Sequence, residues 1–250
     1  ILNNEGLNYA SLPKALISFH KYENEVRKAI DDQIVEGIGY LNLGEDFTFH
    51  FTISPEHEKI VSTHLSKILP NLEQRFGAKI KVEFSFQEKH TDTVALTDSN
   101  DLVRNEFGEV LTRPGGHGAL IHNLNTINSD LIFVKNIDNI AREEFHADVV
   151  EHKKVIGAYL LDIQNQVFGM LKELDSVINQ DRLLELVNWV LVNLKLTISS
   201  DIEELRKTLN KPIRVCGMVK NEGKAGGGPF WVDNGVQIVE SAQMDLENPE

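Results

Sequence analysis

The feature that most constrains the fold is a strand–helix–strand pattern between residues 47 and 86. Apolar and polar side chains alternate over 47–53 and again over 80–86, the period of two that is typical of β-strands. Between these runs, Ser54-Pro55-Glu56 is typical of a helix start, and apolar residues at helical spacing continue to Pro70, which we expect to end or kink the helix. Two strands joined by a crossover helix usually pair in parallel. The sequence therefore predicts a βαβ unit.

Further elements are expected on both sides of this unit. The apolar run 131–137 predicts a central strand covered on both faces, and it stops at Asp138-Asn139. Residues 142–209 have helical spacing almost throughout, and Ser200-Asp201-Ile202-Glu203 is typical of a capping box there. The remaining expected elements are helices over 22–39 and 119–127 and strands over 213–219 and 236–240. This order predicts an α/β sandwich with a helical insertion over 142–209.

Composition narrows the function classes. With 250 residues, 41% hydrophobic and 25% charged, the chain is globular, as one large domain or two small ones. The net charge of −13 argues against a nucleic-acid backbone as partner, although a small anion can still be held locally. The single cysteine, Cys216, excludes an internal disulfide, and we see no membrane span or signal peptide. We expect a cytoplasmic protein, and the ends at Ile1 and Glu250 indicate a piece of a longer chain.

Two candidate sites lie in the first half of the chain. Lys14 follows a proline and precedes apolar residues, where an ammonium could neutralise a phosphate; a solvated surface lysine is the alternative. The segment Arg113-Pro114-Gly115-Gly116-His117-Gly118 lets a backbone run close to a ligand and leads into a helix start. His117 could stack on a base or bond the loop backbone. A glycine-rich turn without a ligand is the alternative for this segment.

Two further candidates follow strands. Asp138 and Asn139 stand at the end of the expected central strand, where open α/β sheets bind ligands, and a carboxylate there could hold Mg²⁺. Capping of a following helix is the alternative for Asp138. Near the C-terminus, Lys220 and Gly227 flank a glycine-rich loop that could close over a substrate, and Glu240 could accept hydrogen bonds from sugar hydroxyls. A linker and an edge-strand acid are the alternatives there.

Taken in order, these segments resemble the sugar-nucleotide pyrophosphorylases, and more closely their uridylyltransferase branch. The resemblance implies that Lys14 grips phosphate, that the glycine loop holds uracil and that Asp138 binds Mg²⁺. It also implies sugar contacts from Asn139, Gly227 and Glu240. Two departures stand out: Ser241 replaces a tyrosine of that family, and no glycine-rich phosphate loop precedes Lys14.

Over residues 12–245 the chain also resembles an uncharacterised bacterial family, a domain of unknown function. The resemblance is carried by Phe19-His20-Lys21-Tyr22, by Phe51-Thr52-Ile53-Ser54-Pro55-Glu56-His57, and by the segment 217–231. It implies the nucleotide-diphospho-sugar transferase fold. That fold is a Rossmann-like three-layer sandwich with a mostly parallel mixed sheet, here a single domain over 1–250.

These observations lead us to expect a Mg²⁺-dependent nucleotidyltransferase. A sugar 1-phosphate would attack the α-phosphorus of UTP and release pyrophosphate, while Lys14, Asp138 and Lys220 position the groups and neutralise charge. The first alternative is a protein of the same fold that binds a nucleotide or sugar without turnover, which the missing glycine loop favours. The second is a glycosyltransferase, which Asn136-Ile137-Asp138 disfavours because it is not an Asp-x-Asp pair. We expect no nucleic-acid or membrane partner.

Overall fold

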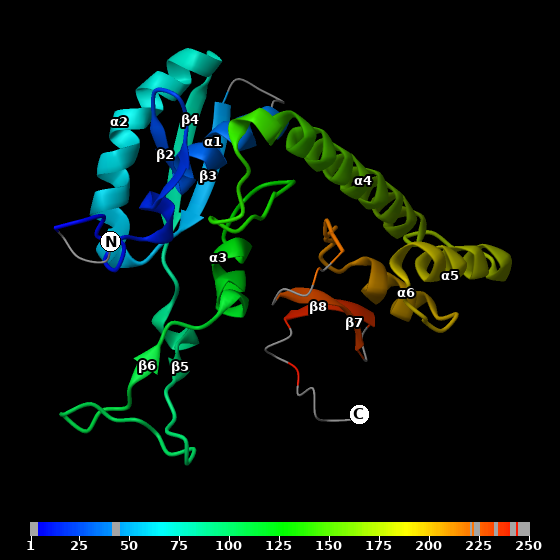
Figure 1. Ribbon diagram of the computed structural model, residues 1–250. Coiled ribbons are helices and arrows are strands. Elements are labelled where there is room, and N and C mark those ends of the chain that lie inside the picture. The colour runs from blue at the N-terminus through cyan, green and yellow to red at the C-terminus, as the bar shows by residue number, and fades with distance from the viewer. Residues whose placement is uncertain are drawn as a thin grey trace. The chain divides into compact units, whose positions relative to one another are not determined.

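The computed structural model describes residues 5–41, 46–220, 222, 226–232, 235–240 and 244. The chain forms two compact units, Ile1–Lys153 and Lys154–Glu250, which are described separately below (Figure 1). The division falls inside a single long helix, α4 (His146–Glu173). This helix lies within the range 142–209 that the sequence predicts to be helical.

The first unit combines helices with short strands. Its strands are β1 (Ser18–Lys21), β2 (Val26–Lys28), β3 (Asp46–Thr52), β4 (Lys79–Ser85), β5 (Thr93–Val94) and β6 (Thr112–Arg113). Its α-helices before α4 are α1 (Ala29–Tyr40), α2 (Glu58–Phe76) and α3 (Ile121–Asn125). Its 3-10 turns are η1 (Lys14–Leu16), η2 (Pro55–His57), η3 (Lys89–Thr91), η4 (His117–Leu120) and η5 (Glu143–Phe145).

The predicted βαβ unit is confirmed. Strands β3 and β4 pair in parallel, with Phe47 opposite Ile80 and Thr52 opposite Ser85, and α2 connects them. Alternate residues of both strands face the core. This core gathers the buried residues of α1, α2, β3 and β4, namely Ile30, Ile34, Ile38, Phe47, Val61, Leu65 and Ile80, together with Ala15 and Leu16 of η1. The period of two in the strands therefore separates an apolar face from a polar one.

A glycine sets the distance between α1 and the sheet. A Cβ atom placed on Gly37 would lie 2.4 Å from Cε1 of Phe49 on β3, closer than two carbon atoms can approach. The helix therefore packs against the Phe49 ring through the backbone of Gly37, which has no side chain. This close approach brings the polar residues of α1 near the segments that flank the sheet.

Residues 131–137 differ from the prediction, since the structure forms no strand there. The side-chain amide of Gln33 on α1 donates hydrogen bonds to the backbone oxygens of Asn136 and Ile137, at 2.9 and 3.1 Å. These carbonyls are therefore bound by a side chain instead of a neighbouring strand. The apolar composition of the run reflects partial burial, with Ile137 packed against the core of α1 and α2.

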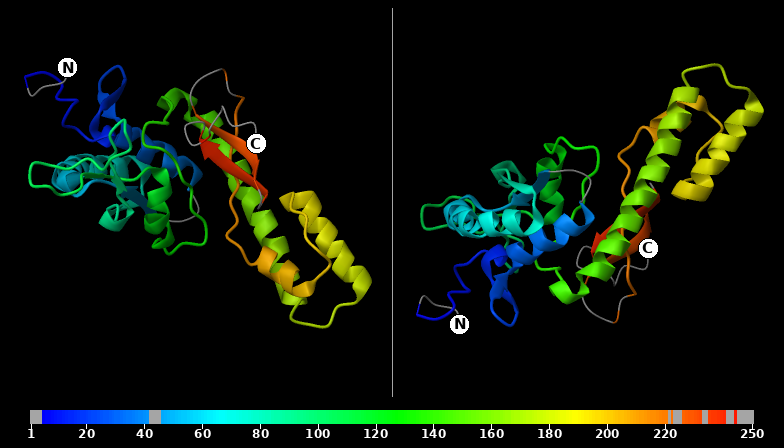
Figure 2. Two further views of the ribbon diagram at one scale, coloured as in Figure 1. Left: turned by 90° about the horizontal axis from the view of Figure 1, so that it is seen from below. Right: turned by 90° about the horizontal axis from the view of Figure 1, so that it is seen from above.

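The second unit contains a helical core and a hairpin. Beyond α4 it comprises α5 (Gln180–Leu194), α6 (Ile202–Leu209), β7 (Gly227–Val232) and β8 (Gly235–Glu240). Figure 2 shows α5 alongside the C-terminal half of α4, and their buried residues share one cluster with α6. Its most deeply buried members are Val167, Leu186, Val190, Leu205 and Leu209. The cap of α6 is Asp201, whose side chain accepts from the Glu204 N–H, rather than Ser200.

The hairpin partly matches the expected C-terminal strands. Strand β8 confirms the prediction over 236–240, whereas the described backbone over 213–219 forms no strand. Strands β7 and β8 pair antiparallel as a local hairpin. Across the described residues, the strands form four two-stranded sheets of which only β3–β4 is parallel. The chain is thus a mixed α/β protein, and the larger Rossmann-like sheet stays a prediction.

Candidate functional site

The structure brings together two of the predicted site residues that are far apart in the chain. Nζ of Lys14 donates to Oδ2 of Asp138 at 2.8 Å, across 124 residues of sequence. Their side chains are 69% and 45% exposed, so both groups can reach a ligand. An ion pair this exposed contributes only about 0–1 kcal/mol to stability. The pair is therefore easily opened by a competing anion or cation.

Asp138 is positioned by a turn held from α1. The N–H of Asn139 donates to the Asn136 oxygen at 3.1 Å, which closes a turn around Asp138. Nε2 of Gln33, a side chain of α1, reaches three backbone oxygens of this segment, including that of Asn139 at 3.4 Å. Gln33 is 8% exposed. A buried side chain thus fixes the backbone that presents an exposed carboxylate.

The glycine loop contacts the segment that follows β4. A Cβ atom on Gly115 would lie 2.6 Å from the backbone oxygen of Thr91, and Nε2 of Gln87 is 3.5 Å from the same position. The Gln87 amide donates to Oγ1 of Thr91 at 2.9 Å. Only glycine permits this approach, so the predicted loop packs tightly beyond the carboxyl end of β4.

Of the other predicted residues of the loop, Arg113 and Gly116 are exposed. Arg113 ends β6 opposite Thr93, and Gly116 precedes η4, which begins at His117. Gly118 is exposed. The expected base contacts of Arg113, Gly116, His117 and Gly118 stay predictions.

Three predicted residues belong to the second unit. Lys220 is exposed in the segment before the hairpin. Gly227 at the start of β7 stands opposite Glu240 at the end of β8, so two residues assigned to sugar binding are cross-strand partners. The intervening glycine-rich loop lies partly outside the described residues, at positions 221 and 223–225. The roles of Lys220, Gly227 and Glu240 stay predictions.

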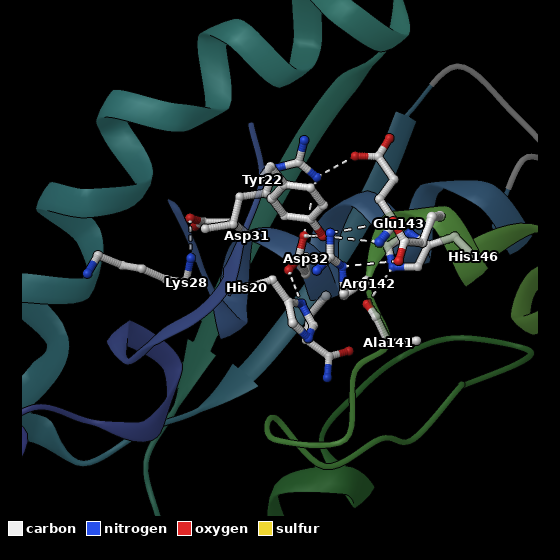
Figure 3. A network of polar contacts seen from close by, with 12 residues as sticks. His20, Tyr22, Lys28, Asp31, Asp32, Ala141, Arg142, Glu143 and His146 are labelled. Atoms are coloured by element: carbon white, nitrogen blue, oxygen red, sulfur yellow. Dashed lines mark hydrogen bonds and ion pairs between the residues drawn. The ribbon is translucent and has the colours of Figure 1, made fainter. Parts of the chain in front are cut away.

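A buried polar network beside α1 is a feature that the sequence prediction missed. Asp32 is fully buried, and Oδ2 of this residue lies 2.6 Å from Nδ1 of His20. Its other oxygen accepts from the Tyr22 hydroxyl and from Nη1 of Arg27, both at 3.2 Å. Figure 3 shows His20, Tyr22 and Asp32 pointing toward one another. Three donors therefore compensate the burial of one carboxylate.

Arg27 extends the network to the start of α4. Its Nη1 donates to Glu143 at 2.5 Å, and Glu143 also binds Arg75 of α2. Burial alone would raise the pKa of Glu143, but the hydrogen bonds from Arg75 and Arg27 outweigh burial and lower it. Burial likewise raises the pKa of the Tyr22 hydroxyl, opposed by the backbone N–H of Glu143 that donates to it at 3.0 Å. Glu143 is thus a junction between the hairpin β1–β2, α2 and η5.

Two more acidic residues of α1 have cationic or histidine partners. Asp31 binds Nε2 of His64 on α2 at 2.6 Å. Glu36 is fully buried and binds Nζ of Lys135, whose pKa is lowered by burial. Burial, with help from Glu36, raises the pKa of Tyr40 to about 12. The sequence contained a sign of this network. Polar residues at positions 31–33 and Glu36 interrupt the apolar spacing of a helix that we expected to be amphipathic.

The arrangement of the acidic side chains limits how a metal ion could bind. Among the described residues, no three His, Cys, Asp or Glu side chains gather in a way that could hold a metal ion. Mg²⁺ typically takes one or two protein carboxylates together with the phosphates of its ligand. The exposed carboxylate of Asp138 is a ligand of this kind, and Mg²⁺ at this position stays a prediction.

Comparison with known proteins identifies the family. The chain matches the domain of unknown function DUF4301 over residues 1–250, and it belongs to that family. No curated protein and no solved structure matches the chain. Of the helices that the structure describes, none has both the length and the apolar composition needed to cross a membrane.

Proposed function

We propose that this protein is a Mg²⁺-dependent nucleotidyltransferase that joins UTP to a sugar 1-phosphate and releases pyrophosphate. The observation that carries the proposal is the 2.8 Å contact between Lys14 and Asp138. An ammonium for phosphate and a carboxylate for Mg²⁺ are the two charges that phosphoryl-type transfer requires within one site. The resemblance of the surrounding motifs to the sugar-nucleotide pyrophosphorylases supports the same reaction.

In the free protein, Lys14 and Asp138 neutralise each other. We infer that a nucleotide with its metal ion separates them, since phosphate is a stronger partner for the ammonium and Mg²⁺ for the carboxylate. When bound, Mg²⁺ would neutralise charge on the phosphates. Lys14 would then hold the phosphate, and the Gln33 side chain would keep the backbone of the Asp138 turn in place. The base-binding role of the glycine loop is supported by the resemblance alone, because the close approach at Gly115 is to the backbone oxygen of Thr91.

Pyrophosphate release tests the proposal. With UTP, Mg²⁺ and a panel of sugar 1-phosphates, we expect turnover that falls about 10²–10³-fold in Lys14→Ala and in Asp138→Asn, as for the loss of one charge-stabilising contact. Lys67→Ala removes an exposed lysine of α2 and should leave the rate unchanged. All three variants should keep the wild-type melting temperature because the altered side chains are exposed.

The non-catalytic alternative predicts a different pattern. If UTP raises the melting temperature, no pyrophosphate appears and Asp138→Asn changes nothing, the protein binds a nucleotide without turnover. If no nucleoside triphosphate is turned over or raises the melting temperature of the wild type, the proposed function is wrong.

A further inference from the structure

The face of β3 and β4 that points away from the apolar core carries a cluster of polar side chains. His50 and Thr52 of β3 share this face with Glu83 and Ser85 of β4, because the pairs 50–83 and 52–85 are in register. The cluster lies toward the carboxyl ends of two parallel strands, the edge where open α/β sheets bind ligands. It uses none of the residues assigned to the nucleotide in the proposed function.

The hydroxyl of Ser85 is the centre of the cluster. Its Oγ is 2.8 Å from Nε2 of His50, 3.1 Å from Oγ1 of Thr52 and 2.9 Å from the Nδ2 atom of Asn123 on α3. The Asn123 amide nitrogen can only donate, so it uses one lone pair of Ser85. The Ser85 proton is then free to point at Nε2 of His50. This is the arrangement of a nucleophile with its general base.

Glu83 provides the third group. Its Oε2 lies 3.8 Å from Nδ1 of His50, and that nitrogen is buried without a hydrogen-bond partner among the described residues. A separation of 3.8 Å is an ion-pair distance and exceeds a hydrogen bond. Such contacts are often long in a protein without substrate and shorten in the complex. Hydrogen bonding and charge from Lys81 lower the pKa of Glu83, which keeps this carboxylate ionised.

Asn123 adds a donor beside the nucleophile. The residue is 6% exposed, and its amide nitrogen also donates to the backbone oxygen of Phe86 at 2.8 Å, so its position is fixed. Both N–H groups of this amide are therefore in use, one on Ser85 Oγ and one on the Phe86 oxygen, so Asn123 acts as a positioning residue for the nucleophile.

We propose that Ser85, His50 and Glu83 form a nucleophilic site that hydrolyses carboxylic esters. Ser85 Oγ would attack the carbonyl carbon of the ester while His50 Nε2 takes the hydroxyl proton. The tetrahedral intermediate would collapse with cleavage of the ester C–O bond, and His50 would return the proton to the leaving alcohol. Water would then attack the acyl-serine, with His50 again taking and returning a proton, to release the carboxylic acid and restore Ser85.

Covalent labelling tests this site without knowledge of the natural substrate. The protein is treated with a fluorophosphonate, digested and analysed by mass spectrometry, and we expect an adduct on Ser85. The labelling rate should fall about 10²-fold or more in His50→Gln, within the range for loss of a general base. Hydrolysis of p-nitrophenyl acetate should be lost in Ser85→Ala and retained in Ser62→Ala, which alters an exposed serine of α2.

Two controls separate folding and the nucleotide site from this chemistry. Each variant should keep the far-ultraviolet circular dichroism spectrum of the wild type, and Lys14→Ala should be labelled at the wild-type rate. Ser85→Ala should melt at a lower temperature because it leaves one N–H of the buried Asn123 without its acceptor. A His50→Gln variant that is folded and labelled as fast as the wild type would overturn the proposal. So would an adduct pattern that omits Ser85.

Discussion

At the scale of single residues, Glu143 links several segments of the first unit. It accepts from Arg27 and Arg75, and its backbone N–H donates to the Tyr22 hydroxyl. Because its pKa in the folded state lies below the ordinary value of 4.5, its contribution to stability is present above that pH. The contribution is lost as the pH falls through the lower, folded-state value.

We therefore expect an acid-dependent difference between the wild type and Glu143→Gln. Near neutral pH the wild type should have the higher melting temperature, and the difference should shrink as the pH falls below about 4.5, because the unfolded chain then binds a proton at Glu143 before the folded protein does. Melting followed by circular dichroism across this range is the measurement. Glu106→Gln removes an exposed carboxylate and should show no such trend. A gap between wild type and Glu143→Gln that stays constant to pH 3 contradicts the assignment.

The sequence indicated some of these residues and not others for a physical reason. Lys14 and Asp138 each stand in a conspicuous local setting, after a proline and at the end of an apolar run. Arg27 and Glu143 meet across 116 residues, and neither is marked by its neighbours in the chain. Pairing between partly buried charges that are far apart in the chain is decided by tertiary packing, so no spacing rule in the sequence predicts it. The Ser85–His50 contact was missed because the βαβ pattern predicts that the two strands pair in parallel but not the register that places Ser85 beside His50.

At the scale of elements, α2 shows how packing can override a local rule. We expected Pro70 to end or kink the helix; α2 does not end there but continues to Phe76, and a kink at Pro70 stays a prediction. Apolar residues on both sides of the proline, including Ile68 and Leu72, pack against the core and hold the last turns. A proline in a helix interior still lacks the N–H that would bond to the preceding turn.

Replacing this proline should stabilise the first unit. Pro70→Ala restores a backbone donor at an exposed position, and we expect a gain of about 1–3 kcal/mol in the free energy of unfolding. Gly77→Ala is the matched variant, for which we expect the opposite effect. Gly77 ends α2 at a φ of 63°, which an alanine adopts only with strain, so the substitution should lower the free energy of unfolding by about 1 kcal/mol. Urea unfolding followed by circular dichroism measures both. A destabilised Pro70→Ala variant would contradict this expectation.

Elements were predicted well where their stabilising contacts are local or periodic. The strands over 46–52 and 79–85 and the helix between them follow from alternation, a capping sequence and helical spacing. The prediction of a strand over 131–137 was wrong. An apolar composition indicates burial, whereas a strand also needs a neighbouring strand to pair with. The hairpin β1–β2 was missed because its strands are only four and three residues long and carry little alternation of apolar and polar side chains.

At the scale of the whole molecule, each unit has its own buried apolar cluster. Both tryptophans, Trp189 and Trp231, lie in the second unit, so tryptophan fluorescence reports on that unit. Leu205→Ala, at a fully buried position there, should lower the free energy of the fluorescence transition by about 2–5 kcal/mol. Ile34→Ala, equally buried in the first unit, should shift the circular dichroism transition instead. Identical shifts in both signals from either variant would show that the units unfold together.

The parallel pairing of β3 with β4 has a consequence for biosynthesis. The hairpins can form as soon as both of their strands leave the ribosome, but β3 must wait until α2 and β4 have been translated. The Lys14–Asp138 contact waits longer still, because its partners are separated by 124 residues. A nascent chain released before residue 138 would therefore carry the lysine without the carboxylate that pairs with it.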